Sequence, residues 1–284
     1  MRCDSHVHIV GDLPRYPQPA DRPYTAGIAE LATLRALAAR RGIARFVIVQ
    51  PSFYLDDNTL MLESLDALAG QGRGVAAIDP AKADPAQMAG YHARGVRGLR
   101  LNLYSPANDK APPLASIFDP TAALALRQGW HVQVIAPLAA LLAASESLTR
   151  SKVPVVIDHY GLFAGVSPGA AAGKGLLALL GLPHVWIKLS APYRSTNDAT
   201  ATKPDPAWLA AMLAAAADRC VWGSDWPHTP PHEAQTGNAV AAPYRDIRYE
   251  DLVDGFLAAL PSTAAADMIM VRNPAALYGF PHKG

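Results

Sequence analysis

Short apolar segments rich in β-branched residues recur along the chain. Most of them lack a clean apolar–polar alternation, which is typical of strands buried on both faces of a parallel sheet. We therefore predict eight buried strands. They cover residues 3–9, 44–50, 74–79, 96–102, 131–135, 153–159, 185–190 and 220–226.

Helical spacing of apolar residues fills the intervals between most of these segments. The predicted helices cover residues 28–41, 60–69, 85–93, 121–127, 138–147, 175–180, 207–217 and 249–259. Strands that alternate with helices indicate βαβ units, and eight such units favour an α/β fold of the (β/α)₈ TIM-barrel type. The chain shows no internal repeat and no convincing linker, so we expect one domain over residues 1–284.

The connections differ in length on the two sides of the predicted strands. Those that lead into strands are short, as in RRGIA and ARGV, whereas several that leave strands are long and rich in proline and glycine. In a barrel these long loops lie on the C-terminal face, where active sites are built. We expect the first of them, residues 12–27, to form a lid or wall of the site.

Composition and charge exclude several classes of protein. The 25 Lys and Arg residues nearly balance the 24 Asp and Glu residues, and no basic patch stands out, so we expect no nucleic-acid partner. No apolar stretch is long enough to span a bilayer and no signal peptide is visible, which argues against a membrane role. Two cysteines in apolar runs suit a reducing compartment, so we expect a cytoplasmic protein. The oligomeric state stays open.

Ionisable side chains gather at the ends of three predicted strands. His6 and His8 stand one residue apart on the first strand, so they point the same way. His159 ends the sixth strand, and Asp225 ends the eighth, which neighbours the first strand in a barrel. Because buried strands rarely carry so many ionisable groups, we predict that these four residues form the catalytic site.

Two neighbours of this set receive a structural interpretation instead. Asp158 directly precedes His159, so strand alternation predicts that its side chain points away from the barrel interior, toward the helices. The same argument leads us to expect an outward-facing Lys188.

Eight stretches spread over nearly the whole chain resemble, in order, the amidohydrolase superfamily. They are DSHVH, VIVQPS, GVRGLRLN, HVQV, VVIDHYG, KLSAPYR, WGSDWPH and NPAALYGF. The pattern HxH alone is typical of many amidohydrolases, but VIVQPS, IDHYG and GSDWPH together resemble the branch of lactone hydrolases. The resemblance implies a barrel enzyme that opens a small anionic lactone, similar to a pyrone dicarboxylate, a muconolactone or a sugar-acid lactone.

The resemblance also raises the question of a metal, since many members bind one or two divalent ions and some lactonases bind none. A two-metal centre needs a bridging carboxylate or carboxylated lysine on the fourth strand, where GLRLN offers neither, and the usual strand-five histidine is missing from HVQVI. One Zn²⁺ remains open on His6, His8 and Asp225, with His159 as an additional ligand. We favour a site without metal, because a conventional fourth ligand is absent.

The implied chemistry assigns roles to these residues and to a second set around them. Asp225 would take a proton from the attacking water, while His6, His8 and His159 would bond to the lactone carbonyl and stabilise the oxyanion. The substrate-binding candidates are Arg100 and Arg194 for a carboxylate, Ser52 and Asn102 for neutral hydrogen bonds, and Tyr193 and His228 as further contacts or orienting groups.

Two positions depart from the lactonase pattern. Ile135 stands where the pyrone-dicarboxylate enzymes have a tyrosine, and Leu162 stands where they have an arginine. Both family residues contact polar groups of the substrate, so we expect fewer carboxylates on the substrate of this chain, or carboxylates placed differently. Two other functions stay open: isomerisation of a sugar-acid lactone on the same barrel, and binding of an organic anion without catalysis.

Overall fold

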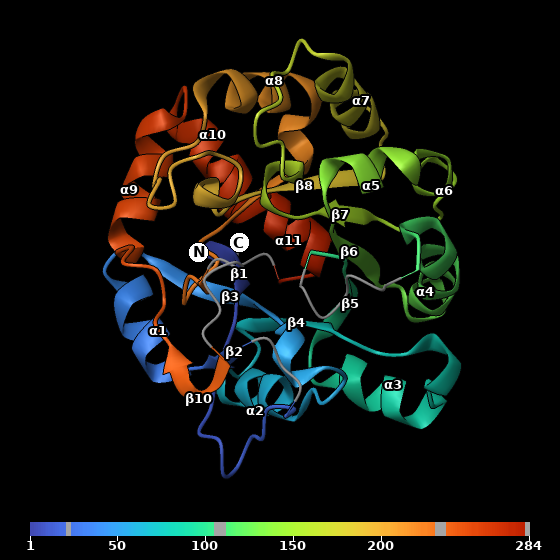
Figure 1. Cartoon of the computed structure of the whole chain (residues 1–284), viewed down its shortest axis with the longest axis vertical. Coiled ribbons are helices and arrows are strands. Elements are labelled where there is room, and N and C mark those ends of the chain that lie inside the picture. Colours follow the sequence, from blue (N-terminus) through green and yellow to red (C-terminus); the bar gives the residue numbers. More distant parts are fainter. Residues whose placement is uncertain (21–23, 105–111, 231–236, 282–284) are drawn as a thin grey trace.

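Eight parallel strands form one sheet in the computed structural model, which describes residues 1–20, 24–104, 112–230 and 237–281. The strands pair in chain order, each with the next (Figure 1). They are β1 (Arg2–Val7), β3 (Ile43–Val49), β4 (Gly72–Ala76), β5 (Val96–Asn102), β6 (His131–Ile135), β7 (Val155–Ile157), β8 (Val185–Ser190) and β9 (Cys220–Gly223).

The sheet closes on itself where β9 meets β1. The backbone N–H of Asp225 donates to the carbonyl of His6 over 2.9 Å, and the N–H of His8 donates to the carbonyl of Trp226 over 2.8 Å. Gly223 allows this approach, because a Cβ at that position would lie 2.6 Å from the Cβ of His6. The predicted (β/α)₈ barrel is confirmed, and each predicted strand overlaps an observed one.

Helices surround the strands as an outer ring (Figure 1). They are α1 (Leu31–Ala39), α2 (Thr59–Ala67), α3 (Pro85–Ala93), α4 (Leu114–Gln128), α5 (Leu138–Ala143), α6 (Ser145–Thr149), α7 (Ala171–Leu180), α8 (Pro206–Ala216) and α9 (Tyr249–Ala259). Helix α4 begins seven residues before the predicted start at residue 121, because the helix continues through Pro120. Within the described part of the chain, no helix is both long enough and apolar enough to cross a membrane.

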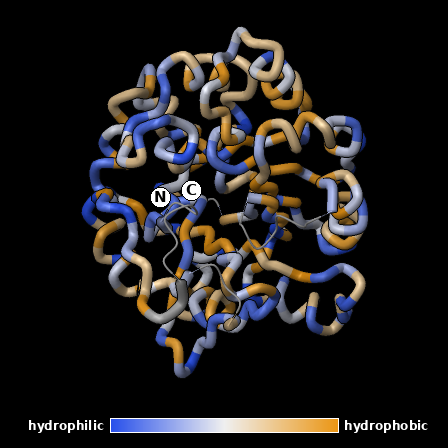
Figure 2. Tube along the Cα trace, viewed as in Figure 1, coloured by the Kyte–Doolittle hydropathy of each residue, from blue (hydrophilic) through white to orange (hydrophobic). Residues whose placement is uncertain are grey.

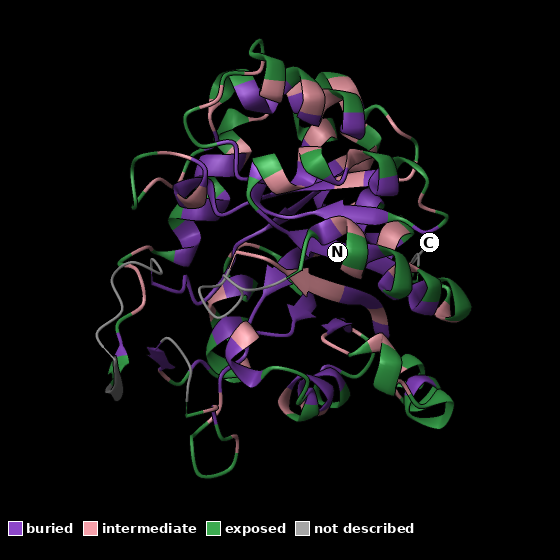
Figure 3. Cartoon of the chain, turned by 45° about the vertical axis from the view of Figure 1, so that its right-hand side comes forward, coloured by how far each residue is buried: buried purple, intermediate pink, exposed green. Residues whose placement is uncertain are grey.

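The core lies between the strands and this ring. Every residue of β6 and β7 is buried, whereas the helices bury one side and expose the other (Figure 3). The hydropathy colouring follows the same division, with strongly apolar segments in the inner strands (Figure 2). This arrangement explains why apolar runs, rather than alternation, mark the strands in the sequence.

Two long loops on the C-terminal side pair with each other, which the sequence pattern did not predict. Strand β2 (Tyr24–Ala26) lies in the loop after β1, and β10 (Gly237–Ala242) lies in the loop after β9. They form a separate two-stranded parallel sheet. Parts of the loops that we expected to determine the substrate, at residues 21–23, 105–111 and 231–236, lie outside the described residues.

The C-terminal segment closes the opposite end of the barrel. It contains α10 (Thr263–Asp267), a π-helical turn (Met268–Arg272) and α11 (Asn273–Tyr278), which lies near the centre of Figure 1. Tyr278 and Phe280 pack against Cys3, Val47 and Val75 from the first three barrel strands. Arg73 on β4 donates to the carbonyls of residues 278 and 279 over 3.0 and 2.8 Å, which fixes this segment to the barrel.

Candidate active site

His6 on strand β1 and His8, which directly follows the strand, lie at the C-terminal end of the barrel, as predicted. His8 Nδ1 lies 2.8 Å from the backbone carbonyl of Val49 on the neighbouring strand. A carbonyl oxygen only accepts hydrogen bonds, so Nδ1 of His8 must carry the hydrogen. A neutral His8 therefore presents a lone pair at Nε2, and this atom lies 3.5 Å from Asp225 Oδ1.

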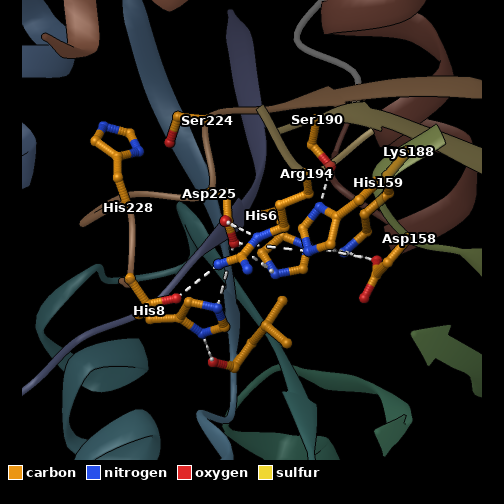
Figure 4. A network of polar contacts seen from close by, with 12 residues as sticks. His6, His8, Asp158, His159, Lys188, Ser190, Arg194, Ser224, Asp225 and His228 are labelled. Atoms are coloured by element: carbon orange, nitrogen blue, oxygen red, sulfur yellow. Dashed lines mark hydrogen bonds and ion pairs between the residues drawn. The ribbon is translucent and has the colours of Figure 1, made fainter. Parts of the chain in front are cut away.

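Asp225 is the centre of the cluster (Figure 4). Its Oδ1 lies 3.5 Å from His6 Nε2, 3.5 Å from His8 Nε2 and 3.7 Å from His159 Nε2. Its Oδ2 accepts hydrogen bonds from the Tyr193 hydroxyl at 2.8 Å and from Arg194 Nε at 2.9 Å. Burial acts to raise the pKa of the Asp225 carboxyl, but the Arg194 guanidinium and the nearby histidines hold it well below its usual range.

His159 reaches the cluster from a short turn that follows β7. The turn spans His159–Gly161, and His159 has a φ of 49°, in the left-handed region that non-glycine residues rarely adopt. Asp225 has a φ of 60°, and there too the chain turns sharply just after a strand. Such strain tends to mark functional sites, because the surrounding structure must hold it in place. The His159 ring is fixed by a 2.9 Å contact between Nδ1 and Ser190 Oγ.

Beneath these residues, the structure corrects two of our expectations. Asp158 and Lys188 do not face outward but point into the barrel, where both are fully buried. Lys188 Nζ donates to Gln133 Oε1 over 2.6 Å and lies 3.6 Å from Asp158 Oδ1. Lys188 has the same strand parity as Ser190, whose hydroxyl faces His159, so correct counting along β8 would have placed it inward.

Above the cluster lies a small pocket. Four of the substrate-binding candidates line it together with His8, His159 and Asp225: Ser52, Arg100, Asn102 and Arg194. Other lining residues, missed in the sequence, are Tyr24, Pro51, Phe53, Tyr104 and Thr229; Ile135 was singled out only as a departure from the lactonase pattern. Tyr24 belongs to β2, so the loop of residues 12–27 does supply a wall of the pocket.

The two arginines of the pocket differ in their partners. Arg194 bonds to Asp225 through Nε and to the Thr229 hydroxyl over 2.6 Å through an Nη atom. Arg100 donates to the backbone carbonyl of Gln50 over 2.5 Å and makes no ion pair with a described carboxylate, and its buried Nε has no partner in the described structure. Arg100 is therefore the guanidinium that has charge to offer to a bound anion.

Tyr193 and His228 are not among the residues that line this pocket, and His6 lies beneath it, behind Asp225. Tyr193 donates its hydroxyl hydrogen to Asp225 Oδ2, and His228 Nδ1 lies 3.4 Å from the Tyr193 oxygen. Burial lowers the pKa of His228 to about 4, so this imidazole is neutral over the ordinary working range. The two residues are placed to orient Asp225, which is the orienting role that the sequence left open for them.

The residue types and spacing at Asp225 fit one divalent metal. His6, His8 and Asp225 each offer a ligand atom, and these atoms lie close together. Two ligands at ~2.1 Å from a tetrahedral zinc are ~3.4 Å apart, close to the 3.5 Å separations observed from Asp225 Oδ1. Buried His6 Nε2 and Asp225 Oδ1 also have no hydrogen-bond partner in the described structure.

Comparison with characterised proteins places this geometry in context. The chain is 26% identical over 289 residues to 4-sulfomuconolactone hydrolase of Hydrogenophaga intermedia, an alignment that covers 99% of this chain and 89% of the relative. It is 28% identical to 2-pyrone-4,6-dicarboxylate hydrolase of Comamonas testosteroni, with 97% and 89% covered. It is 27% identical to D-galactarolactone isomerase of Agrobacterium fabrum, with 97% and 90% covered.

The alignments with these relatives run over nearly the whole of this chain. The family model described as amidohydrolase matches residues 3–280, which includes all four residues of the predicted catalytic cluster. The chain belongs to the amidohydrolase family.

Proposed function

We propose that the protein is a hydrolase that opens the ring of a small carboxylated lactone. The observation that carries this proposal is the convergence of three imidazole Nε2 atoms on Asp225 Oδ1, at the floor of a pocket that also presents Arg100. An ester carbonyl needs an activated water, a hydrogen-bond donor for its oxygen and a proton for the leaving group. The three relatives, two lactone hydrolases and a lactone isomerase, support this substrate class.

The attacking water would lie between Asp225 and His8. Asp225 Oδ1 and His8 Nε2 are both acceptors, 3.5 Å apart, and one water molecule can donate a hydrogen to each. The oxygen lone pair of that water is then free to attack the carbonyl carbon. The bond to Val49 thus changes the role that we propose for His8, because a neutral His8 has no N–H to offer to the substrate.

Bond making and breaking follow in two steps. The water oxygen bonds to the carbonyl carbon while Asp225 accepts a water proton, and His6 and His159 donate hydrogen bonds to the oxygen that becomes negative. The tetrahedral intermediate then collapses, the ring C–O bond breaks, and the leaving oxygen takes the proton from Asp225. Because Arg194 keeps the pKa of Asp225 low, Asp225 is a weak base, so oxyanion stabilisation must contribute most of the acceleration.

The substrate carboxylate would bind to Arg100, with Ser52 and Asn102 as neutral neighbours in the same pocket. A guanidinium can bond a carboxylate through two parallel N–H groups. Arg194 is already committed to Asp225 and Thr229, so we propose a substrate with one anionic group near the ring rather than two.

A metal remains the alternative to this scheme. His6, His8 and Asp225, with His159 beside them, are the residues that would hold one divalent ion. Such an ion would supply a Lewis acid that polarises the carbonyl. The pocket residues would bind and orient the substrate in the same way in both cases.

A panel of lactones tests the proposal. Pyrone, muconolactone and sugar-acid lactones are incubated with the protein, with and without a chelator, and the products are identified by NMR. Hydrolysis yields an open-chain acid without a lactone ring. Failure to open any lactone in the panel, before and after addition of zinc, would sink the proposal. Activity that is lost on chelation and restored by zinc would replace the metal-free scheme with the metal alternative.

A second candidate function is isomerisation of a sugar-acid lactone, which the similarity to D-galactarolactone isomerase favours. The same acid–base groups around a carbonyl could move a ring closure from one hydroxyl to another. The NMR products separate the two functions, because an isomerase preserves a lactone ring whereas a hydrolase consumes it.

A further inference from the structure

Four buried polar side chains form a layer beneath the catalytic cluster. They come from four different strands or strand ends: His6 on β1, Gln133 on β6, Asp158 after β7 and Lys188 on β8. None has a relative exposure above 1%. Burying an ammonium and a carboxylate costs several kcal/mol per ion unless their partners compensate, and the hydrolysis scheme above makes no use of Lys188. The layer therefore needs an explanation.

The hydrogen-bond directions within this layer can be assigned. Gln133 Nε2 donates to Asp158 Oδ2 over 2.8 Å, so the other amide atom, Oε1, is the one that faces Lys188 at 2.6 Å. Lys188 Nζ makes two hydrogen bonds, to Gln133 Oε1 and to His6 Nδ1 at 3.4 Å, whereas Asp158 Oδ1 lies 3.6 Å away and has no hydrogen-bond partner in the described structure. An ammonium has N–H donors and no lone pair, so Lys188 donates in both bonds.

The bond from Lys188 determines where the hydrogen of His6 lies. If Lys188 donates to Nδ1 of His6, that nitrogen carries no hydrogen, and a neutral ring must carry it on Nε2. The Nε2 atom is the one that faces Asp225 Oδ1. The amide oxygen of Gln133 at 2.6 Å and the carboxylate of Asp158 at 3.6 Å are partners that suit an ammonium at Lys188.

We propose that Lys188 is a positioning residue that holds His6 in the tautomer with its hydrogen on Nε2. His6 then offers a hydrogen-bond donor to the lactone carbonyl, and it has no Nε2 lone pair to give to a metal ion. The catalytic part of this inference rests on the proposed lactone chemistry, whereas the tautomer does not. The assignment also separates His6 from His8, which presents a lone pair to the same carboxylate oxygen.

Asp158 would stabilise the other neutral tautomer of His6, with its hydrogen on Nδ1. Its Oδ1 lies 3.4 Å from His6 Nδ1 and has no hydrogen-bond partner in the described structure. If the ammonium of Lys188 is removed, Nδ1 loses its hydrogen-bond donor, and this carboxylate, at the same distance, favours a hydrogen on that nitrogen. Nε2 then presents a lone pair, which is the form that a metal ligand requires. Lys188→Met is therefore expected to weaken catalysis and to strengthen zinc binding together.

The decisive experiment is ¹⁵N NMR of the histidine rings in the full-length wild-type protein, with the His6 signals assigned by their loss in a His6→Asn variant. We expect Nδ1 of His6 to have the shift of an unprotonated ring nitrogen and Nε2 that of a protonated one. The opposite pattern in the wild-type protein overturns the proposal, whether or not any variant folds. Stoichiometric zinc bound through His6 in the purified protein would overturn it as well.

Two variants extend the test. In Lys188→Met the two His6 signals should exchange character, kcat on a lactone should fall about 10²-fold, as for loss of one oxyanion donor, and zinc affinity measured by calorimetry should rise. Gln133→Met is the matched control, because it breaks the same layer but leaves the contact between Lys188 and His6. It should keep the wild-type tautomer and most of kcat. Equal loss of kcat in both variants, with the tautomer unchanged, would show a purely structural role.

The NMR readout needs no substrate. A protein that opens no lactone but shows the expected His6 signals would contradict the proposed function and leave the tautomer assignment standing.

Discussion

The two ends of this barrel surround their buried charges with different partners. At the end where the strands begin, Arg73 is surrounded by neutral carbonyls and lies 4.4 Å from the centre of the Phe280 ring, and the C-terminal segment covers it. At the end where the strands finish, the Asp225 carboxylate faces three imidazoles and Arg194 beneath an open pocket. The first end is closed by the chain itself, whereas the second leaves Asp225 Oδ1 without a hydrogen-bond donor among the described residues.

The difference shows how one scaffold separates stability from chemistry. A buried polar atom without a partner is costly, so its presence calls for an explanation such as a ligand or a catalytic role. Substitutions at the closed end should therefore change the free energy of unfolding and leave turnover per folded molecule unchanged. Substitutions at the open end should change turnover per folded molecule more than they change the free energy of unfolding. Four predictions test this division.

The largest effect is expected at Asp225. Asp225→Asn removes the base for the attacking water, so kcat on a good lactone should fall by about 10²–10⁴-fold, while circular dichroism still reports a folded barrel. Asp254→Asn, which changes an exposed carboxylate paired with Arg41, is the control and should keep its activity. Wild-type turnover in Asp225→Asn would refute the assignment of the base.

The next effect concerns the closed end. Phe280 is buried against Tyr278 and the barrel strands, so Phe280→Ala should lower the free energy of unfolding by about 3–5 kcal/mol. Its kcat at a temperature where it remains folded should match the wild type. Leu126→Ala removes a side chain that is 51% exposed and should cost far less. A large drop in kcat of folded Phe280→Ala would mean that the two ends are coupled.

A smaller effect is expected at Arg100. Loss of a charged hydrogen bond is worth about 1.5–3 kcal/mol, so Arg100→Met should raise KM for anionic lactones by roughly 10–150-fold, and KM for neutral lactones much less. Arg97→Met is the matched control on the same strand, because Arg97 bonds to backbone carbonyls and does not line the pocket. Equal changes for both kinds of lactone would show that Arg100 does not bind the carboxylate.

The effect that is smallest at neutral pH is a pH dependence at the closed end. Burial lowers the pKa of His131, at the start of β6, from 6.5 to about 3. Between these values the unfolded chain binds a proton that the folded protein does not, so stability is lost as the pH falls, by up to about 1.4 kcal/mol per pH unit. Urea unfolding across this window should show a shallower decline in His131→Phe than in the wild type. Parallel curves would contradict this origin.

The fold was largely predictable because its strands are buried on both faces. The apolar runs that mark such strands can be recognised without knowing which segments lie beside them. The paired strands β2 and β10 were not predictable, since neither segment has a pattern of its own and each is stabilised by a partner far away in the sequence. The position of the C-terminal segment was not predictable either. It packs against the end where the barrel strands begin, through contacts with Cys3 and Val75.

The residues of the site could be predicted from the sequence, but the orientation and hydrogen-bond partners of their side chains could not. His6, His8, His159 and Asp225 do converge, and their catalytic roles stay predictions. The error at Asp158 arose because alternation was extended past the end of β7, where the chain turns at His159 with a positive φ. The roles of His8 and Arg194 depend on a backbone carbonyl and a carboxylate from other strands, which no local pattern reveals.

The pairing of β2 with β10 has a consequence for altering substrate choice. These segments tie the loop after the first barrel strand to the loop after the last one, and Tyr24 on β2 is part of the pocket wall. A loop grafted from a relative would lose its pairing partner unless both loops were exchanged together. For recombination between relatives, the two loops therefore act as one module, although more than two hundred residues of chain separate them.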